Sequence, residues 1–442
     1  MTDHPDALTR LFRACEPSES LEPGDPRYVN LDEARGDQVV EAFERSIRRA
    51  RPDAAEVKLF AGHRGVGKTS ELLRLKSLLE RDRTSDGLGR AFVVFYFDVG
   101  DSLDVNDLDF PDLLVATAKE VQEGIEKLQF PGTGAVTTYL KRVWSEIIEG
   151  LGAEVSISGA EVEIPKFGKL SLELRNRPNK RSVLREAIER HSTSLLEAVN
   201  DLLDTARAGA RKSGFEGIVL IIDGLDKLVR RPVDDGASNS HERLFIDRSE
   251  QLASLHAHTI YTVPISLIYS PRCTSLEQTF GEFNQPVSMI RIRGEDRSSP
   301  TPETVGMRKM REMLERRCSH ASTTMAAAFD DLSTADYLCE MTGGHPRHLM
   351  MFIQSAANGI DTLPITRAAA ERAIRNYANS LRREIHDREW DALRTFATPR
   401  DDIPKDEIHQ EMLYLLHVYE YMNGEPWYEV NPVVRILPKF TE

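Results

Sequence analysis

Cysteine is scarce in this chain, and long apolar runs are missing. Its 442 residues include four cysteines, and no two of them have the Cys-x-x-Cys spacing of a metal site or a redox pair. The longest apolar runs, residues 218–222 and 263–269, are far too short to cross a bilayer. The first residues have neither a basic nor an apolar segment and predict no signal peptide. We therefore expect a cytoplasmic protein with no membrane association.

The chain also lacks an excess of positive charge. Its net charge is −14, which argues against a general affinity for nucleic acid or for an anionic membrane surface. The apolar content of 40% and the charged content of 29% are typical of a soluble globular protein. There is no internal repeat and no low-complexity tract, and the length predicts about two to four domains.

A phosphate-binding motif follows the first buried strand expected from the sequence. Residues 57–60 are an apolar run, and residues 70–80 carry leucines at helical spacing. The segment between them fits the pattern G-x-x-x-x-G-K-[ST]. Its residues are Gly62, His63, Arg64, Gly65, Val66, Gly67, Lys68, Thr69 and Ser70. Strand, glycine-rich loop and helix N-terminus in this order predict a nucleotide-binding loop.

Each part of the motif has a physical role. The three glycines allow the backbone N–H groups to approach the phosphates closely. We expect Lys68 to reach the β- and γ-phosphates and the Thr69 hydroxyl to bind Mg²⁺. The sequence therefore predicts ATP and Mg²⁺ as ligands.

The acidic partner of such a loop follows a second apolar run. Residues 218–222 end at Asp223, which we expect to hold the Mg²⁺ ion and its water shell. Many motor ATPases have a glutamate at the next position, where it activates water, but this chain has Gly224. Asp226 is the remaining carboxylate nearby, and it either orients the water or ties down the loop. We expect slow hydrolysis.

The order of the patterns predicts an α/β fold with a parallel sheet, of the P-loop NTPase kind, followed by two smaller units. Residues 1–30 are proline-punctuated and read as an N-terminal arm. The nucleotide-binding domain spans 31–298 and includes a hairpin insertion at about 150–178. Its expected strands are 57–60, 91–99, 218–222, 264–270 and 287–292. A helical lid (299–383) and a winged-helix module (384–442) follow, the latter with an Asn423-Gly424 hairpin turn.

These motifs resemble those of the AAA+ superfamily. The run ending in Asp-Gly-Leu-Asp (223–226) is similar to the Walker B motif of STAND ATPases, particularly the NACHT group. The resemblance implies that Arg272, after the fourth expected strand, is a sensor facing the γ-phosphate. Residues 343–349 are similar to the lid motif of these proteins, which implies that Pro346 and Arg347 bind nucleotide. Each segment also has a simpler reading, as a surface turn or a helix start.

The running pattern around residues 62–72 also resembles a set of bacterial ATPases associated with signalling and anti-phage systems. The resemblance implies an ATP/ADP switch that assembles with itself or engages a separate sensor or effector protein. The sequence shows no recognisable effector domain. Two alternatives remain open: a DNA-binding initiator or loader of the AAA+ type, and a scaffold that binds nucleotide without hydrolysing it.

The composition of the C-terminal module argues against DNA binding. Residues 381–442 contain 8 Lys and Arg against 13 Asp and Glu. The helix expected at 406–418, which would enter the groove, has no Lys or Arg, although phosphate contacts need cations. Glu425, Trp427, Tyr428 and Glu429 would lie in the wing and repel phosphate. We expect this module to pack on the nucleotide-binding domain.

Overall fold

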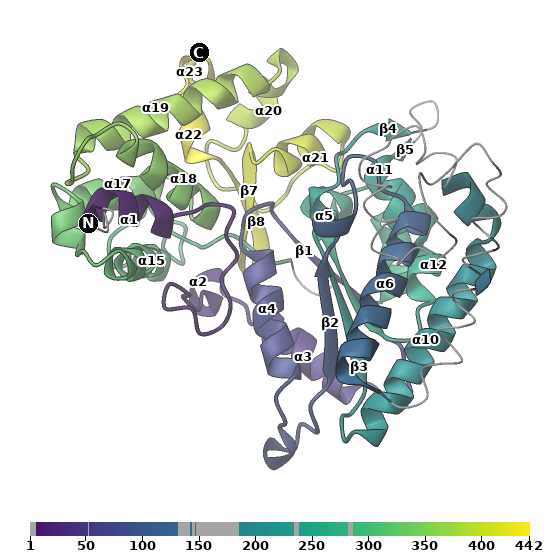
Figure 1. Ribbon diagram of the computed structural model, residues 1–442. Helices are drawn as coiled ribbons and strands as arrows, with labels where there is room; N and C mark the ends of the chain where they lie inside the picture. Colours follow the sequence, from purple (N-terminus) through teal and green to yellow (C-terminus); the bar gives the residue numbers. More distant parts are fainter. Residues whose placement is uncertain are drawn as a thin grey trace, which may run out of the picture.

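The computed structural model describes residues 6–51, 53–130, 142–143, 146, 185–233, 238–281 and 286–442. Its centre is a four-stranded parallel sheet with the order β1-β6-β3-β2 (Figure 1). The strands are β1 (Val57–Gly62), β2 (Val93–Asp98), β3 (Ile218–Asp223) and β6 (His258–Pro264). Strand β6 lies between the phosphate-loop strand and the aspartate-bearing strand. This is the predicted P-loop NTPase fold, with the additional strand of the ASCE type.

Side chains alternate between the two faces of the sheet because the period of a strand is two residues. Leu59 and Leu220 belong to a core with α6 and α10, whereas Phe60 and Ile221 pack with α3 and α4. Figure 1 shows these two helix pairs on opposite sides of the sheet. With both faces covered, the strands can be apolar along their whole length. That is why their runs stand out in the sequence.

The helices between α1 and the lid come next in the chain. They are α2 (Asp32–Arg35), α3 (Val39–Arg49), α4 (Lys68–Leu79), α5 (Val99–Ser102), α6 (Phe110–Leu128), α10 (Ser192–Lys212), α11 (Ser240–Glu242), α12 (Ser249–Ala253), α13 (Ile265–Ile268) and α14 (Cys273–Phe280). A short antiparallel pair, β4 (Pro232–Val233) and β5 (Ser238–Asn239), follows β3. The hairpin expected at about 150–178 lies outside the described residues.

From Val305 onwards the chain is helical up to a C-terminal hairpin. Its helices are α15 (Val305–His320), α16 (Met325–Ala328), α17 (Leu332–Met341), α18 (Pro346–Ala357), α19 (Arg367–Glu384), α20 (Trp390–Arg394) and α21 (Glu407–Tyr414). Strands β7 (Val418–Asn423) and β8 (Glu425–Val430) then pair antiparallel, and α22 (Pro432–Arg435) and α23 (Pro438–Thr441) close the chain. The order of helices and hairpin is the one predicted for residues 384–442.

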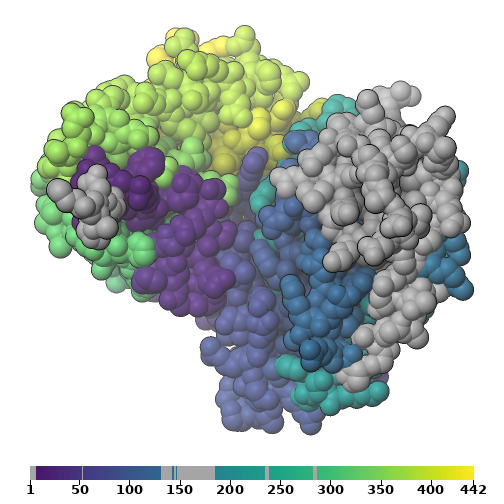
Figure 2. All heavy atoms as spheres, viewed as in Figure 1, coloured from purple at the N-terminus to yellow at the C-terminus, as the bar shows by residue number. Residues whose placement is uncertain are grey.

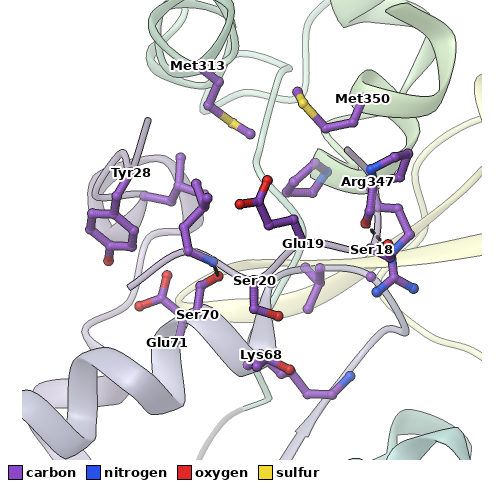
Figure 3. A pocket seen from close by; sticks show the side chains of 18 of the residues that line it. Ser18, Glu19, Ser20, Tyr28, Lys68, Ser70, Glu71, Met313, Arg347 and Met350 are labelled. Atoms are coloured by element: carbon purple, nitrogen blue, oxygen red, sulfur yellow. Dashed lines mark hydrogen bonds between the residues drawn. The ribbon is translucent and has the colours of Figure 1, made fainter. Parts of the chain in front are cut away.

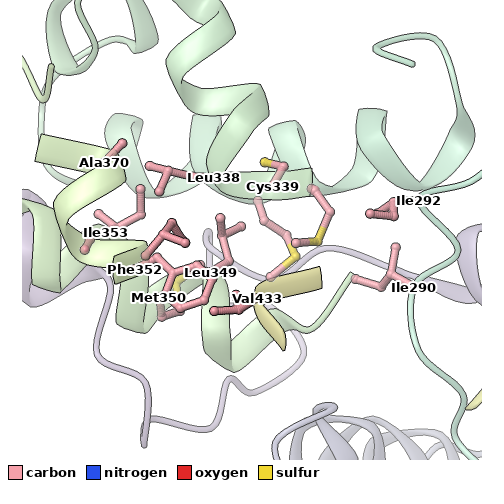
Figure 4. Packing of buried hydrophobic residues seen from close by; sticks show 14 of the residues in the cluster. Ile290, Ile292, Leu338, Cys339, Leu349, Met350, Phe352, Ile353, Ala370 and Val433 are labelled. Atoms are coloured by element: carbon pink, nitrogen blue, oxygen red, sulfur yellow. The ribbon is translucent and has the colours of Figure 1, made fainter. Parts of the chain in front are cut away.

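One apolar core joins these C-terminal elements. Leu349 and Phe352 of α18 pack with Leu338 of α17, and Val433 of α22 and Ile290 belong to the same cluster (Figure 4). The cluster also takes in residues of the N-terminal helix α1 (Ala7–Ala14). The arm is therefore not free of the lid, because its first helix is part of the lid's core.

The fourth expected strand, 264–270, is wrong in its position. The strand β6 occupies 258–264, and α13 begins at Ile265. The polar residues Thr259 and Thr262 hid the strand in the sequence. Both are fully buried, and both hydroxyl groups have a backbone partner: Thr259 Oγ1 donates to the Ala257 carbonyl, and Thr262 Oγ1 accepts the Leu225 N–H group.

The fifth expected strand, 287–292, joins the sheet at one residue. Val287 forms a parallel bridge with Gly62, and the next amides turn to other partners. Met289 N donates to Glu420 O of β7, and Ile290 N donates to Gly344 O of the lid. This segment is therefore the junction between the sheet, the lid and the hairpin.

Two expected helices are interrupted. The helix expected from residue 31 to residue 51 divides into α2 and α3 at Gly36, which has φ +80°. The long helix expected at 182–212 is described from residue 185, and it has a turn at His191, after which α10 begins at Ser192.

A substitution at Gly344 would test how much the close contact at this junction contributes to stability. Its φ is +83°, and a Cβ atom would lie 1.9 Å from Ile290 O. We expect Gly344→Ala to lower the free energy of unfolding by about 2–4 kcal/mol, through backbone strain and overlap together. Gly424→Ala is the matched control, because Gly424 has φ +77° with nothing within 4 Å. It should cost about 1 kcal/mol, from strain alone. Equal losses in urea unfolding would show that the contact with Ile290 is unimportant.

Candidate nucleotide-binding site

A cleft lies where the phosphate loop, the N-terminal arm and the lid meet. It is lined by residues 64–71 of the loop and α4, by arm residues 16–21, and by Met313 and Met350 of α15 and α18. In Figure 3, Lys68 and Ser70 lie on one side of this cleft and the two methionines on the opposite side. Figure 2 shows the N-terminal segment in purple against the lid, in green.

The phosphate loop leaves the N-terminus of α4 open. Gly65 has φ +84°, and Gly67, the N-cap residue, has φ +103°. No side chain caps the helix, so its first N–H groups have no partner from a cap. An uncapped helix N-terminus behind a glycine-rich loop is suited to bind an anion.

Lys68 is buried beneath this loop. Its Nζ donates to the carbonyl oxygens of Gly62 and His63, both at 2.8 Å, and lies 2.9 Å from Asp226 Oδ2. Asp226 is 7% exposed and Lys68 5% exposed. The structure therefore places Asp226 against the cation of the loop, the arrangement expected if Asp226 ties the loop down.

Two further carbonyl groups of the loop are bound from outside it. Arg64 O accepts from His345 Nε2 at 2.9 Å, and Val66 O accepts from Arg35 Nη2 at 2.6 Å. Arg35 is in turn paired with Glu71 of α4, at 2.7 Å. With its carbonyl oxygens held in this way, the loop can present N–H groups to the cleft.

Thr69 and Asp223 meet at the end of the sheet. The Thr69 side chain lies near the Asp223 carboxylate, and Tyr96 Oη donates to Asp223 Oδ2 at 2.9 Å. Burial, with Asp226 and Asp98 nearby, raises the pKa of Asp223. A hydroxyl beside a carboxylate is the donor pair that a P-loop offers Mg²⁺, whose other ligands are phosphate and water. Among the described residues there is no cluster of three or more acidic, His or Cys side chains that could hold a metal by itself.

Three arginines give the cleft positive charge. Arg64, Arg317 and Arg347 line it, and among the described residues none of them forms an ion pair with a carboxylate. Burial, with Arg64 nearby, lowers the pKa of Arg347. Its Nε donates to Pro17 O of the arm at 3.2 Å. Glu16, Glu19, Glu71 and Asp226 also line the cleft. Arginines that are not paired with these carboxylates favour an anionic ligand.

The arm is fastened on both sides of the cleft. Leu21 N donates to Ser70 Oγ at 3.0 Å, so the last residue of the motif holds the arm. Arg27 forms ion pairs with Glu19 and Asp25 at 2.5 and 2.7 Å. On the lid side, Gln354 Nε2 donates to Phe12 O. Because the arm is irregular between its two ends, periodicity could not show that it lines the site.

Buried histidines connect the loop to the C-terminal half of the chain. His63 Nε2 accepts the Glu420 N–H at 2.8 Å, so its Nδ1–H faces Leu413 O at 3.2 Å. His345 caps α18 by accepting the His348 N–H, which leaves its Nε2–H to donate to the loop. Burial lowers the pKa of His63 and of His345 to about 3. Both rings are therefore neutral at pH 7.

Arg272 is not at the cleft. Its Nη2 lies 2.6 Å from Asp247 Oδ1, and its side chain is 44% exposed. The sensor position predicted for it required residue 272 to follow a strand directly, but α13 intervenes between β6 and this turn. Pro346 and Arg347, in contrast, do line the cleft, together with Asp226 and the loop.

The proposed wing of the C-terminal module is mostly buried. Trp427, Tyr428 and Glu429 are 2–4% exposed, so only Glu425 of the four residues expected there faces solvent. Glu429 pairs with Arg293 at 2.6 Å. These side chains therefore say little about contacts with DNA.

The fold and the phosphate loop together are those of a P-loop NTPase. Three solved structures with a similar layout are distant from this chain in sequence. A Walker-type ATPase of Pyrococcus abyssi is 15% identical, with a TM-score of 0.44 over 95% of this chain and 98% of that one. Drosophila ORC bound to DNA is 11% identical (TM-score 0.40; 98% and 92%), and the Aeropyrum pernix ORC1 protein in complex with DNA is 12% identical (0.38; 96% and 94%). No family model and no curated protein matches. Likenesses this distant do not assign a function.

No helix among the described residues is long and apolar enough to span a membrane.

The neutral histidines predict loss of stability in acid. Their folded pKa lies below the ordinary 6.5, so the unfolded chain binds more protons as the pH falls from 6.5 towards 3, and stability decreases over that range. His345→Asn keeps an N-cap acceptor for α18 but cannot titrate. We expect a smaller difference in unfolding free energy between pH 7.5 and pH 5 in this variant. His386→Asn, at an exposed N-cap, is the control and should retain the parent's difference. An unchanged pH dependence in the His345 variant would contradict the assignment.

Proposed function

We propose that this protein is an ATP-dependent switch of the AAA+/STAND type, in which bound nucleotide determines how the lid and the C-terminal module sit on the phosphate loop. The observation that carries the proposal is the set of bonds from His63 and His345. One connects the loop to the hairpin and α21, and the other connects it to α18. A change in the loop on binding phosphate therefore alters its hydrogen bonds to the lid and to the C-terminal module.

The residues that would bind ATP·Mg²⁺ are already grouped. Lys68 and the N–H groups of the loop would hold the β- and γ-phosphates, and Thr69 and Asp223 would hold the metal. Arg347 follows the N-terminus of α18 and lies with Arg64 beside Gly65: a Cβ atom on Gly65 would be 3.1 Å from Arg347 Cβ. A guanidinium contact to the γ-phosphate exists with ATP and not with ADP, so Arg347 would report which nucleotide is bound.

The output we propose is assembly, either of this chain with itself or with a separate sensor or effector protein, in bacterial signalling or anti-phage defence. The position of α21 supports a role inside the molecule. Gln410 Nε2 donates to Tyr269 O, and Tyr414 Oη donates to Leu228 O. Within α21, all of which the structure describes, Glu407 alone is exposed. A helix used in this way is not free to enter a DNA groove.

The switch predicts that ATP binding and assembly are lost together in Lys68→Ala. Removing a charge-assisted contact of about 2 kcal/mol should weaken ATP binding at least about 30-fold. Lys76→Ala, on the same helix but paired with Glu80 at the surface, is the matched control. Calorimetry would measure affinity, and mass photometry with no nucleotide, ADP or ATP plus Mg²⁺ would measure assembly. Unchanged ATP affinity in the Lys68 variant would refute the site. An unchanged mass in every condition would contradict nucleotide-driven self-assembly and would favour a scaffold or a protein that needs a partner.

DNA binding by the lid is the second candidate. The last turn of α19 exposes Arg382 and Arg383, and Arg375 is exposed on the same helix. If these arginines contact phosphates, a filter-binding titration should give an affinity that falls steeply with salt. Arg382→Glu combined with Arg383→Glu should reduce the slope by about 2, one for each lost contact. No binding at low salt would eliminate this candidate.

A further inference from the structure

Gly224 occupies a position that no larger residue could take without rearrangement. Its φ is +85°, and a Cβ atom would lie 2.2 Å from Asp98 Oδ1 and 3.0 Å from Asp98 Cγ. The space where a side chain at 224 would begin is thus filled by the carboxylate of Asp98. The glutamate that motor ATPases carry after the metal-binding aspartate is absent here, and a carboxylate from another strand stands in its place.

Asp98 comes from the neighbouring strand. It is the last residue of β2 and the register partner of Asp223 on β3. The two aspartates therefore end adjacent strands at the carboxyl edge of the sheet, which is where open α/β sheets bind ligands. Asp98 Oδ2 accepts from Lys227 Nζ at 2.6 Å, and Lys227 lines the nucleotide cleft. Asp98 is thus one side chain away from the cleft.

The other carboxylates near the loop are engaged in holding the loop. Asp226 pairs with Lys68 at 2.9 Å, and Glu71 pairs with Arg35 at 2.7 Å. Lys227 is a different kind of partner, because its side chain is 35% exposed and can turn to another anion. A phosphate dianion in the cleft competes with Asp98 for this ammonium group.

We propose that Asp98 is the carboxylate that orients the attacking water during ATP hydrolysis, and that Lys227 holds it until the γ-phosphate binds. This inference rests on the proposed ATP binding. The water oxygen bonds to the γ-phosphorus, the bond from that phosphorus to the bridging oxygen breaks, and its electron pair leaves with ADP. One water proton passes through Asp98 to solvent and the other stays on the inorganic phosphate. ATP and water thus give ADP, inorganic phosphate and a proton.

Two substitutions of Asp98 test the proposal without disturbing the backbone. Asp98 Oδ1 caps α5 by accepting the Gly100 N–H at 2.8 Å, and Asn or Ser can do the same. We expect Asp98→Asn and Asp98→Ser to bind ATP within about threefold of the parent and to hydrolyse it at least about 100-fold more slowly in single turnover. Nucleotide extracted after incubation should be ATP in these variants and ADP in the parent. Asp98→Glu should recover part of the rate.

The controls separate this inference from the proposed function. Asp86→Asn, at an exposed position in a surface turn, should behave as the parent. Folded Asp98→Asn or Asp98→Ser protein that hydrolyses ATP at the parent's rate would overturn the role of Asp98. The role of Asp98 would also be overturned if Asp226→Asn lost hydrolysis while the Asp98 variants kept it. Loss of ATP affinity in both Asp98 variants would overturn it too. A parent that binds ATP and never hydrolyses it would overturn this inference and leave the nucleotide site standing. A parent that does not bind ATP would refute the proposed function itself.

Discussion

The phosphate loop must satisfy its buried carbonyl groups and leave N–H groups for an anion, and much of the structure meets that one requirement. The bonds to four of its carbonyl groups come from three parts of the chain. Lys68 supplies two from within the loop, Arg35 supplies one from the segment before the sheet, and His345 supplies one from the lid. Since buried carbonyl groups without partners are costly, the loop's conformation depends on the lid staying in place. Conversely, the position of the lid depends on the conformation of the loop, so a nucleotide that changes the loop also changes the position of the lid.

The C-terminal hairpin of β7 and β8 is also hydrogen-bonded to the phosphate loop. Glu420 of β7 gives its N–H to His63 and its carbonyl to Met289 N, and its own side chain is fully buried. Burial raises the pKa of Glu420 to about 8. Tyr269 Oη donates to this carboxyl group. The hairpin is therefore attached to the loop and to the end of α13 through polar groups in a dry environment, where such bonds are directional and specific.

Sequence patterns predicted the parts of the fold whose cause is local. The strands at 57–60 and 218–222 were visible because both of their faces are buried, and the phosphate loop was visible because its glycines and Lys68 have fixed spacing. The strand β6 was misplaced, since Thr259 and Thr262 are polar by type but buried with satisfied hydroxyl groups. The arm was not seen as part of the cleft, because its contacts with Ser70 and Arg347 depend on chain segments far away in sequence.

The sequence by itself determined the class of site: a P-loop with Lys68, Thr69 and an aspartate at the end of a buried strand. Only the tertiary structure decided which other groups reach that site. It places Arg272 outside the cleft, beyond the short helix α13, and it places Asp98 in the space beside Gly224. The physical reason is that spacing along a chain specifies neighbours within one loop or helix. Which strand ends lie side by side depends on sheet order, and that order is decided by packing across the whole domain.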